Sequence, residues 1–297
     1  MLPELRTIFF IGKGGVGKTT ISTNLSLDLS EDSFPTHLLS IDPANNLYDY
    51  FAITKDSSIK PINNFLTIEE CDIESKMNTL INKTIEEMKS QYKHLTILNL
   101  ENLFNAIKFS PGINEYLCLL TIYDTYIKIK NNKTYFLIDS PPTGLFLQML
   151  SLLKTSKLWL KELITLREKI IEKRFFLDRF KNKTSFSRND TPIEKLKTEA
   201  TIIESLETLF SKSSTKFCLI INNDNLSMKE GEYIISKCNK LDISIDLIIV
   251  NKFKRKNLDT SLIFKNHKKC VFPQIESLNS IKFNRADIKK IIDLLYP

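Results

Sequence analysis

Short apolar runs alternate along most of this chain with longer stretches that have helical spacing. The runs are almost continuously apolar, which is typical of strands that are buried on both faces of a parallel sheet. The predicted strands cover residues 5–11, 36–42, 64–70, 133–139, 216–221, 246–251 and 270–273. The predicted helices cover residues 19–30, 145–180, 193–210 and 287–296, and helical spacing also dominates residues 73–132. The alternation predicts an α/β fold with a mainly parallel, doubly wound sheet.

The turn after the first predicted strand carries the clearest chemical motif. Residues 10–20 have the sequence F-I-G-K-G-G-V-G-K-T-T, so Gly12, Gly17, Lys18 and Thr19 match the phosphate-binding P-loop pattern. A glycine-rich turn could match by chance, but the flanking strand and helix favour a P-loop NTPase fold. The predicted nucleotide-binding residues of this loop are Gly12, Lys13, Gly14, Gly15, Val16, Gly17, Lys18, Thr19 and Thr20.

Two further predicted strands end in aspartates, Asp42 and Asp139. A carboxylate at the carboxyl end of a parallel strand points into the ligand crevice of an open α/β sheet. Asp42 is therefore expected to orient or deprotonate an attacking water or to reach Mg²⁺ through water, and Asp139 to hold Mg²⁺ through water. A helix cap or a turn is the alternative for Asp42. The predicted metal site comprises Thr19, Asp42 and Asp139, and Lys18 joins Asp42 as a catalytic residue.

Three segments together resemble the ArsA/GET family of ATPases, which includes arsenite-pump ATPases and ATPases that deliver tail-anchored membrane proteins. They are the loop K-G-G-V-G-K-T at residues 13–19, D-P-A at 42–44 and D-S-P-P-T-G at 139–144. The chain has only seven glycines, and six of them lie in the P-loop, counted from Gly12, in residues 139–144 or in P-G-I-N-E at 111–115, which also resembles the family. Asn45, Asn114 and Leu145 depart from the family pattern.

The resemblance implies further roles for single residues. Lys13 would reach across a homodimer interface to the partner's nucleotide and act as a catalytic residue. Asn251 would contact the adenine edge, to which a side-chain amide can both donate and accept a hydrogen bond. Pro273 would lie in the segment that covers the adenine. The resemblance also implies one P-loop domain over residues 1–297, with a helical subdomain formed by inserts at about 73–132 and 151–212.

The implied function is that of a nucleotide-switch ATPase, a homodimer that couples ATP hydrolysis to the handling of a hydrophobic protein client or a membrane-protein partner. The amphipathic inserted helices favour this hypothesis, whereas the scarcity of methionine in the second insert and the absence of a C-x-x-C pair count against it. Two alternatives stay open at this point. One is a subunit of an arsenite or anion pump, and the other is a ParA/MinD-like positioning ATPase that acts on DNA or a membrane.

Composition narrows these choices only partly. The net charge is +7, and basic residues concentrate at 151–190 and 251–290, where they could face an acidic partner or solvent. The Pro-Thr-Gly segment argues against the positioning ATPases, so nucleic acid is not an expected partner. The five cysteines are scattered, which predicts no zinc site, and the cofactors expected are ATP and Mg²⁺. No apolar run is long enough for a membrane span and no signal peptide precedes the first strand, so we expect a cytoplasmic protein.

Overall fold

In the computed structural model, eight strands form one sheet in the order β3-β4-β2-β5-β1-β6-β7-β8. The structure describes residues 5–43, 47–54, 59–91, 110–130, 133–180, 190–253, 264, 267–273 and 283–297. Within these residues all neighbouring strands are parallel except the β3–β4 pair. The predicted α/β class and the mainly parallel sheet are therefore confirmed.

The strands agree with the apolar runs to within a few residues. Their bounds are β1 Arg6–Ile11, β2 Thr36–Ser40, β3 Lys60–Pro61, β4 Leu66–Glu70, β5 Tyr135–Asp139, β6 Thr215–Asn222, β7 Leu247–Phe253 and β8 Lys268–Pro273. Only β3 was not predicted, because two residues that include a proline give no apolar run. It pairs antiparallel at the edge of the sheet, where proline is tolerated.

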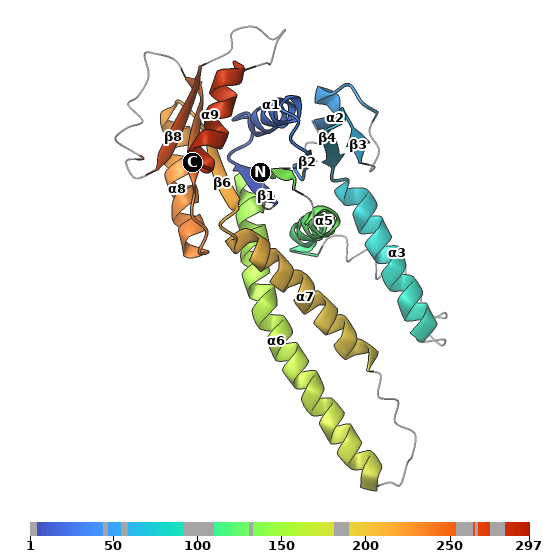
Figure 1. Ribbon diagram of the computed structural model, residues 1–297. Helices are drawn as coiled ribbons and strands as arrows, with labels where there is room; N and C mark the ends of the chain where they lie inside the picture. Colours follow the sequence, from blue (N-terminus) through green and yellow to red (C-terminus); the bar gives the residue numbers. More distant parts are fainter. Residues whose placement is uncertain are drawn as a thin grey trace.

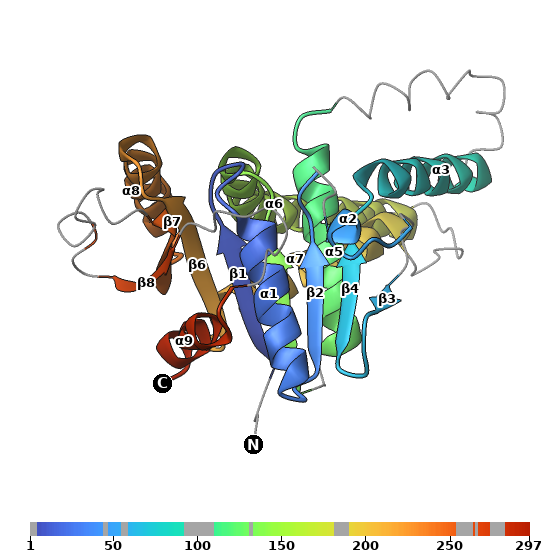
Figure 2. The same cartoon turned by 90° about the horizontal axis from the view of Figure 1, so that it is seen from above.

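Helices cover both faces of the sheet, as Figures 1 and 2 show. One face carries α1 Lys18–Glu31, α2 Leu47–Tyr50 and α9 Arg285–Leu295, and the other carries α5 Ile113–Ile129, α6 Thr143–Phe180, α7 Thr191–Ser211 and α8 Asn225–Lys240. Successive side chains of a strand point to opposite faces. Accordingly, Ile8 and Phe10 of β1 pack with α1, whereas Phe9 and Ile11 pack with the helices of the other face. A parallel sheet with two cores explains why its strands are continuously apolar.

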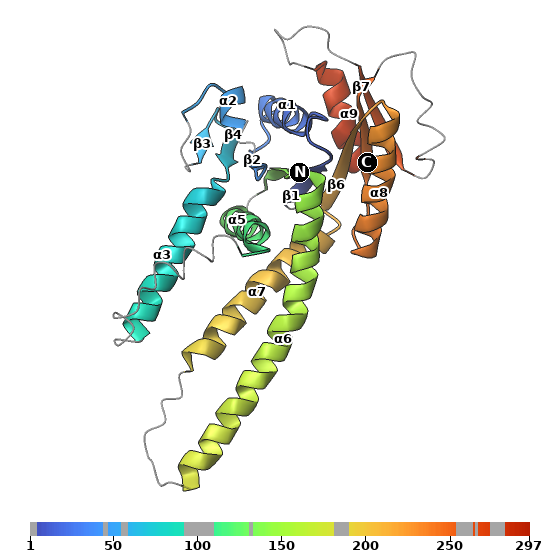
Figure 3. The ribbon, with the colours of Figure 1, turned by 180° about the vertical axis from the view of Figure 1, so that it is seen from behind.

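Among the described residues, α3 Ile73–Gln91, α6 and α7 extend beyond the sheet on the α5 side, as Figure 3 shows from behind. Of these, α6 and α7 form an antiparallel pair. With 38 residues, α6 is about 57 Å long and far exceeds the width of the sheet. We call the part of this pair that projects from the sheet, α6 from Lys157 onward with the first half of α7, the arm. Within the inserts, helices are present at 73–91, 113–129, 143–180 and 191–211, while residues 92–109, 131–132 and 181–189 lie outside the described residues. The division into a domain and a subdomain stays a prediction.

The arm carries a charged contact between its two helices and an exposed apolar stripe. Asp190 caps the start of α7 by accepting a hydrogen bond from the Ile193 amide, and Arg167 of α6 donates two hydrogen bonds to the same carboxylate at 2.9 and 2.7 Å. On another side of α6 the apolar side chains are exposed, with Trp159 68% exposed and Leu166 55% exposed. Among the described residues, no helix is long and apolar enough to cross a membrane.

Candidate functional site

The predicted site residues converge at the carboxyl ends of three adjacent strands. The loop of residues 12–17 leaves β1, Asp42 follows β2, and Asp139 ends β5. The register places Asp139 opposite Phe10 of β1 and Ser40 of β2. Residues that lie about 100 positions apart in the sequence are thus neighbours at one edge of the sheet, as the strand pattern predicted.

The loop passes so close to other backbone and side-chain atoms that two of its glycines cannot be replaced without a shift. A Cβ atom on Gly12 would clash with the carbonyl of Ile220. A Cβ atom on Gly17 would lie 2.5 Å from Nδ2 of Asn251, and Gly17 has a positive φ of 97°. Val16 is buried against the core on the α1 side and anchors the loop. Gly14 and Gly15 complete the loop, and α1 begins at Lys18, so Thr19 and Thr20 lie in its first turn.

Lys18 lies at the centre of the site and is only 5% exposed. Its ammonium nitrogen lies 3.5 Å from Oδ2 of Asp42 and donates a hydrogen bond to the Lys13 carbonyl at 3.3 Å. A buried lysine that contacts a carboxylate and a loop carbonyl is held within reach of any anion in the loop. The structure therefore brings the two predicted catalytic residues Lys18 and Asp42 together.

Asp139 is fully buried and has one carboxylate oxygen without a hydrogen-bond partner among the described residues. The other oxygen, Oδ2, accepts hydrogen bonds from the Thr19 hydroxyl at 2.6 Å and from the Ser40 hydroxyl at 3.4 Å. Burial raises the pKa of Asp139 to about 7, although Thr19 and Lys18 favour the charged form. A desolvated carboxylate with an open oxygen is poised for a cation.

The donors around Asp139 fit Mg²⁺. Magnesium prefers oxygen ligands and is held by one or two carboxylates together with substrate phosphates and water. The Thr19 hydroxyl, the Asp139 carboxylate and the nearby Asp42 carboxylate are oxygen donors of this kind. Ser40 was not predicted, because a serine at the end of β2 gave no signal of its own.

Lys13 lies at the exposed rim of the loop. Its ammonium nitrogen is 3.1 Å from Oε2 of Glu230 on α8. The predicted contact of Lys13 with a partner's nucleotide is not tested in a single chain, so it stays a prediction. Glu230, which lies in α8, was not predicted as a site residue.

Asn251 is buried at the end of β7 and contacts the loop. Its Nδ2 donates a hydrogen bond to the Val16 carbonyl at 2.8 Å, and its Oδ1 accepts one from the Lys252 amide at 2.8 Å. Lys252, which was not predicted as a site residue, donates from Nζ to the Gly15 carbonyl at 2.9 Å. The predicted adenine contacts of Asn251 and Pro273 stay predictions, with Pro273 at the end of β8 opposite Phe253.

The segment after Asp139 leads directly into the arm. Ser140 is buried and donates from its hydroxyl to the Phe10 carbonyl at 2.6 Å. The Thr143 hydroxyl is buried without a partner among the described residues, and Gly144 follows it in the first turn of α6. Leu145 also lies in this turn, and Asn114 lies at the start of α5. Asn45 lies outside the described residues.

Comparisons with known proteins agree with this geometry. The family model of the anion-transporting ATPases, ArsA, matches residues 5–291. The "Putative arsenical pump-driving ATPase 2" of Aquifex aeolicus is 27% identical over 254 residues, which cover 85% of this chain and 82% of that protein. The "Putative arsenical pump-driving ATPase 1" of the same organism is 28% identical and the "ATPase ASNA1 homolog" of Plasmodium falciparum is 32% identical, each over 84% of this chain. This chain spans 63% of the length of each of these two relatives.

Proposed function

This chain belongs to the family of anion-transporting ATPases of the ArsA type, and from that premise we propose that it binds ATP with Mg²⁺ and hydrolyses the γ-phosphate. The observation that supports the proposal most directly is that four side chains lie together beside the loop of residues 12–17. They are those of Lys18, Thr19, Asp42 and Asp139. Their residue types supply the parts that phosphoryl transfer requires: a cation for the phosphates, a carboxylate for the water and oxygen donors for the metal.

Each residue then has a defined task. The loop amides and Lys18 bind the β- and γ-phosphates. Asp42, whose side chain is partly open to solvent, orients the attacking water and accepts its proton. Thr19 and Asp139 hold Mg²⁺, which when bound neutralises charge that develops on the phosphates. Ionised Asp139 is the form that would hold the cation, and burial alone favours its protonated form.

We further propose that ATP closes a homodimer through Lys13. The exposed Lys13 ammonium lies at the rim of the loop, where a second copy could approach it. In the free chain it pairs with Glu230, so crossing to a partner's nucleotide exchanges one anionic contact for another. An exposed ion pair of this kind is weak, which makes the exchange inexpensive.

The arm supplies the proposed client surface. Trp159, Leu163, Leu166 and Ile170 recur at intervals of four, three and four residues, which places them on one side of α6. The first three have 68%, 39% and 55% of their surface exposed. A continuous exposed apolar stripe of this kind is typical of a binding surface for an apolar helix. We therefore propose a hydrophobic protein segment as the client.

The cysteines support this interpretation over an anion pump that binds trivalent arsenic through thiolates. All five cysteines are free and buried. Burial raises the pKa of every one of these thiols, so each is held in the protonated form that binds metals and metalloids poorly. Free thiols are also typical of a reducing compartment, which supports a cytoplasmic location.

The proposal is tested by measuring solution mass with ATP and Mg²⁺. The variant Asp42→Asn is used to slow hydrolysis, and the double variant Asp42→Asn/Lys13→Ala removes the proposed crossing residue. We expect a dimer for the first variant with ATP, and a monomer for the double variant and for either one without nucleotide. A monomer throughout would exclude the shared-site dimer, and failure of the wild-type chain to hydrolyse ATP would exclude the ATPase.

A further inference from the structure

We propose that Lys252, together with Asn251, is a positioning residue that holds the P-loop in its phosphate-binding conformation before any ligand arrives. The proposal rests on the nucleotide site proposed above but concerns residues on a different strand from those that would touch the phosphates or the metal. It assigns to the end of β7 the task of shaping the loop that leaves β1.

The backbone at Lys252 is unusual for a lysine. Its φ angle is +53°, in the left-handed region that residues with a Cβ atom rarely adopt. The β7–β8 register shifts between Val250 and Phe253, so an irregularity of the bulge type surrounds this residue. Bulges commonly occur beside functional sites, where they redirect a side chain. A strained backbone conformation persists only where surrounding contacts compensate for its cost. The contacts of Lys252 therefore indicate the function of this residue.

Both residues donate hydrogen bonds to successive carbonyl groups of the loop. Lys252 Nζ donates to the Gly15 carbonyl at 2.9 Å, and Asn251 Nδ2 donates to the Val16 carbonyl at 2.8 Å. The two donors are themselves connected, because Asn251 Oδ1 accepts a hydrogen bond from the Lys252 amide. Gly17 permits the close approach, since any Cβ atom there would meet the Asn251 amide. We call this set of three hydrogen bonds the loop brace.

Because the peptide bond is planar, the contacts of these carbonyl groups also determine where the neighbouring N–H groups point. In a trans peptide the C=O and the following N–H point in opposite directions. Fixing the carbonyl of Gly15 therefore fixes the direction of the Val16 N–H, and fixing the carbonyl of Val16 fixes that of the Gly17 N–H. With both carbonyls turned toward β7, the two N–H groups point away from β7, into the loop. Inward N–H groups are what a loop of this kind offers to phosphate oxygens.

The other two lysines of the loop region do not supply these contacts. Lys18 reaches Asp42 and the Lys13 carbonyl, and Lys13 pairs with Glu230. The Gly15 carbonyl receives its side-chain hydrogen bond from Lys252. Because Lys252 and Asn251 each fix one peptide group, the ligand does not have to order them, and any polyphosphate should bind more tightly.

The brace differs from base recognition in a measurable way. Recognition of adenine by Asn251 would make its removal change the ratio of affinities for ATP and GTP. Loss of the brace would weaken ATP, GTP and inorganic tripolyphosphate alike and leave the ratio unchanged. Three variants distinguish the effect of charge on ligand affinity from that of hydrogen bonding. Lys252→Met removes both the charge and the hydrogen-bond donor, whereas Asn251→Ala removes a donor and leaves the charge of the site unchanged. Lys252→Arg retains a donor and the charge.

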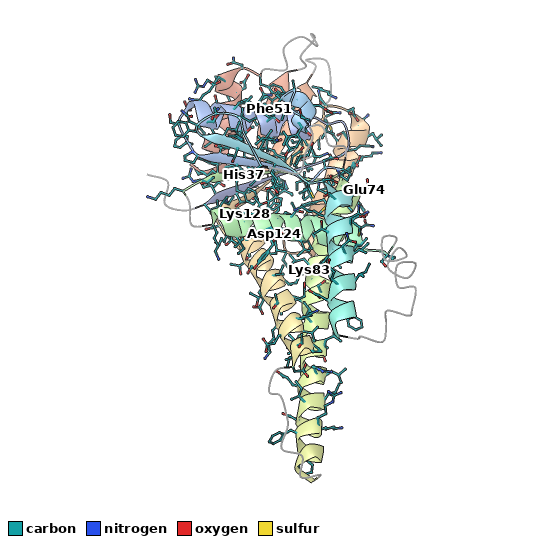
Figure 4. All side chains as sticks on the ribbon, turned by 90° about the vertical axis from the view of Figure 1, so that its right-hand side faces the viewer. His37, Phe51, Glu74, Lys83, Asp124 and Lys128 are labelled. Carbon is teal, nitrogen blue, oxygen red and sulfur yellow. The ribbon has the colours of Figure 1, made fainter. Side chains whose placement is uncertain are left out.

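The first experiment measures binding of MgATP, MgGTP and tripolyphosphate by calorimetry. We expect affinities about tenfold weaker or more for Lys252→Met and Asn251→Ala with all three ligands, and near-wild-type affinities for Lys252→Arg. The matched control is Lys128→Met, an exposed lysine of α5 far from the loop (Figure 4). Unchanged tripolyphosphate affinity in both variants, or a change confined to the ATP-to-GTP ratio, would overturn the proposal.

The second experiment needs no ligand. Hydrogen exchange of residues 12–20 is followed in the nucleotide-free protein by mass spectrometry, with residues 5–11 of the central strand as an internal reference. Faster exchange of the loop in Lys252→Met, with an unchanged reference, supports the brace, and unchanged exchange of the loop refutes it. If wild-type protein bound no nucleotide, the proposed ATPase would fail, and the exchange rates would still decide whether the brace exists.

Discussion

The carboxyl edge of the sheet and the arm depart from the ordinary distribution of polar and apolar groups in opposite directions. At the sheet edge, Lys18 is 5% exposed and Asp139 is fully buried. On the arm, Trp159 is 68% exposed, and Lys157 lies at the surface, where it pairs with Glu207 in the second half of α7. Charged groups are inside in one region, and large apolar groups are outside in the other.

Burying charged groups and exposing apolar groups both cost free energy in the free chain. Each arrangement therefore indicates a binding site for a ligand or partner. A buried charge is tolerated where a partner is present or expected, and an exposed apolar stripe is stable only until something covers it. The comparison therefore indicates that the carboxyl edge of the sheet binds charged ligands, an anion and a cation. By contrast, it indicates that the arm binds an apolar surface. The following predictions test whether these two regions are independent.

The largest effect is expected from Asp42→Asn. Loss of the carboxylate that orients and accepts a proton from water should lower kcat for ATP by a factor of about 100 or more, while nucleotide affinity stays within a few-fold. The companion variant Trp159→Ser/Leu166→Ser should leave turnover without client unchanged. Steady-state hydrolysis measures both. Wild-type turnover in Asp42→Asn would remove this residue from the mechanism, and loss of turnover in the arm variant would show that the two regions are coupled even without client.

The next effect separates packed from exposed leucines in the same helix pair. Leu206 of α7 is fully buried in the core, whereas Leu166 of α6 is 55% exposed. Leu206→Ala should reduce the free energy of unfolding by about 2–5 kcal/mol, because it leaves a cavity. Leu166→Ala should change it by about 0.5 kcal/mol or less. Denaturation by urea measures both, and a large loss for Leu166→Ala would mean that the stripe is already covered within the protein.

The smallest expected effect is a pH dependence of the free energy of unfolding that arises from Glu69, next to His37 of β2. His37 lies 3.6 Å from Glu69 in the sheet (Figure 4), and Thr125 of α5 donates a hydrogen bond to the same carboxylate. Burial raises the pKa of Glu69, but His37, Thr125 and the charge of Lys76 outweigh it and leave this pKa below the ordinary value of 4.5.

Because the folded state holds this proton less tightly, Glu69 stabilises the fold above pH 4.5, and this contribution is lost as the pH falls through the lowered pKa. The difference in unfolding free energy between wild type and Glu69→Gln should therefore shrink below pH 4.5. A wild-type to Glu69→Gln difference that is constant from pH 7 to pH 3.5 would contradict the assignment.

Much of the sheet edge could be predicted from the sequence, because strand ends and a glycine-rich motif fix positions. Lys18, Asp42 and Asp139 were expected to meet on that basis, and the structure brings them together. The arm was predicted as helices, since amphipathic spacing is a strong local signal. The eight-stranded order itself was beyond the sequence pattern, which says little about which strands are neighbours.

What the sequence did not reveal depends on where single side chains point. Lys252 was not predicted as a site residue, because its left-handed backbone and its reach to Gly15 follow from an irregularity at the end of β7. The pairing of Lys13 with Glu230 joins a loop to a helix more than 200 residues later. Neither contact has a periodic signature, because each arises from the packing of separate strands and helices.

The long helix α6 begins beside the candidate nucleotide site and ends at the tip of the arm. The helix begins at Thr143, four residues after the buried Asp139, and continues for about 57 Å without a break to the end of the arm. A tilt of about 5° at this fulcrum moves the far end by about 5 Å, which is roughly one helical turn. A small change of orientation beside Asp139 would therefore be enlarged along α6, on which Trp159 and Leu166 lie exposed.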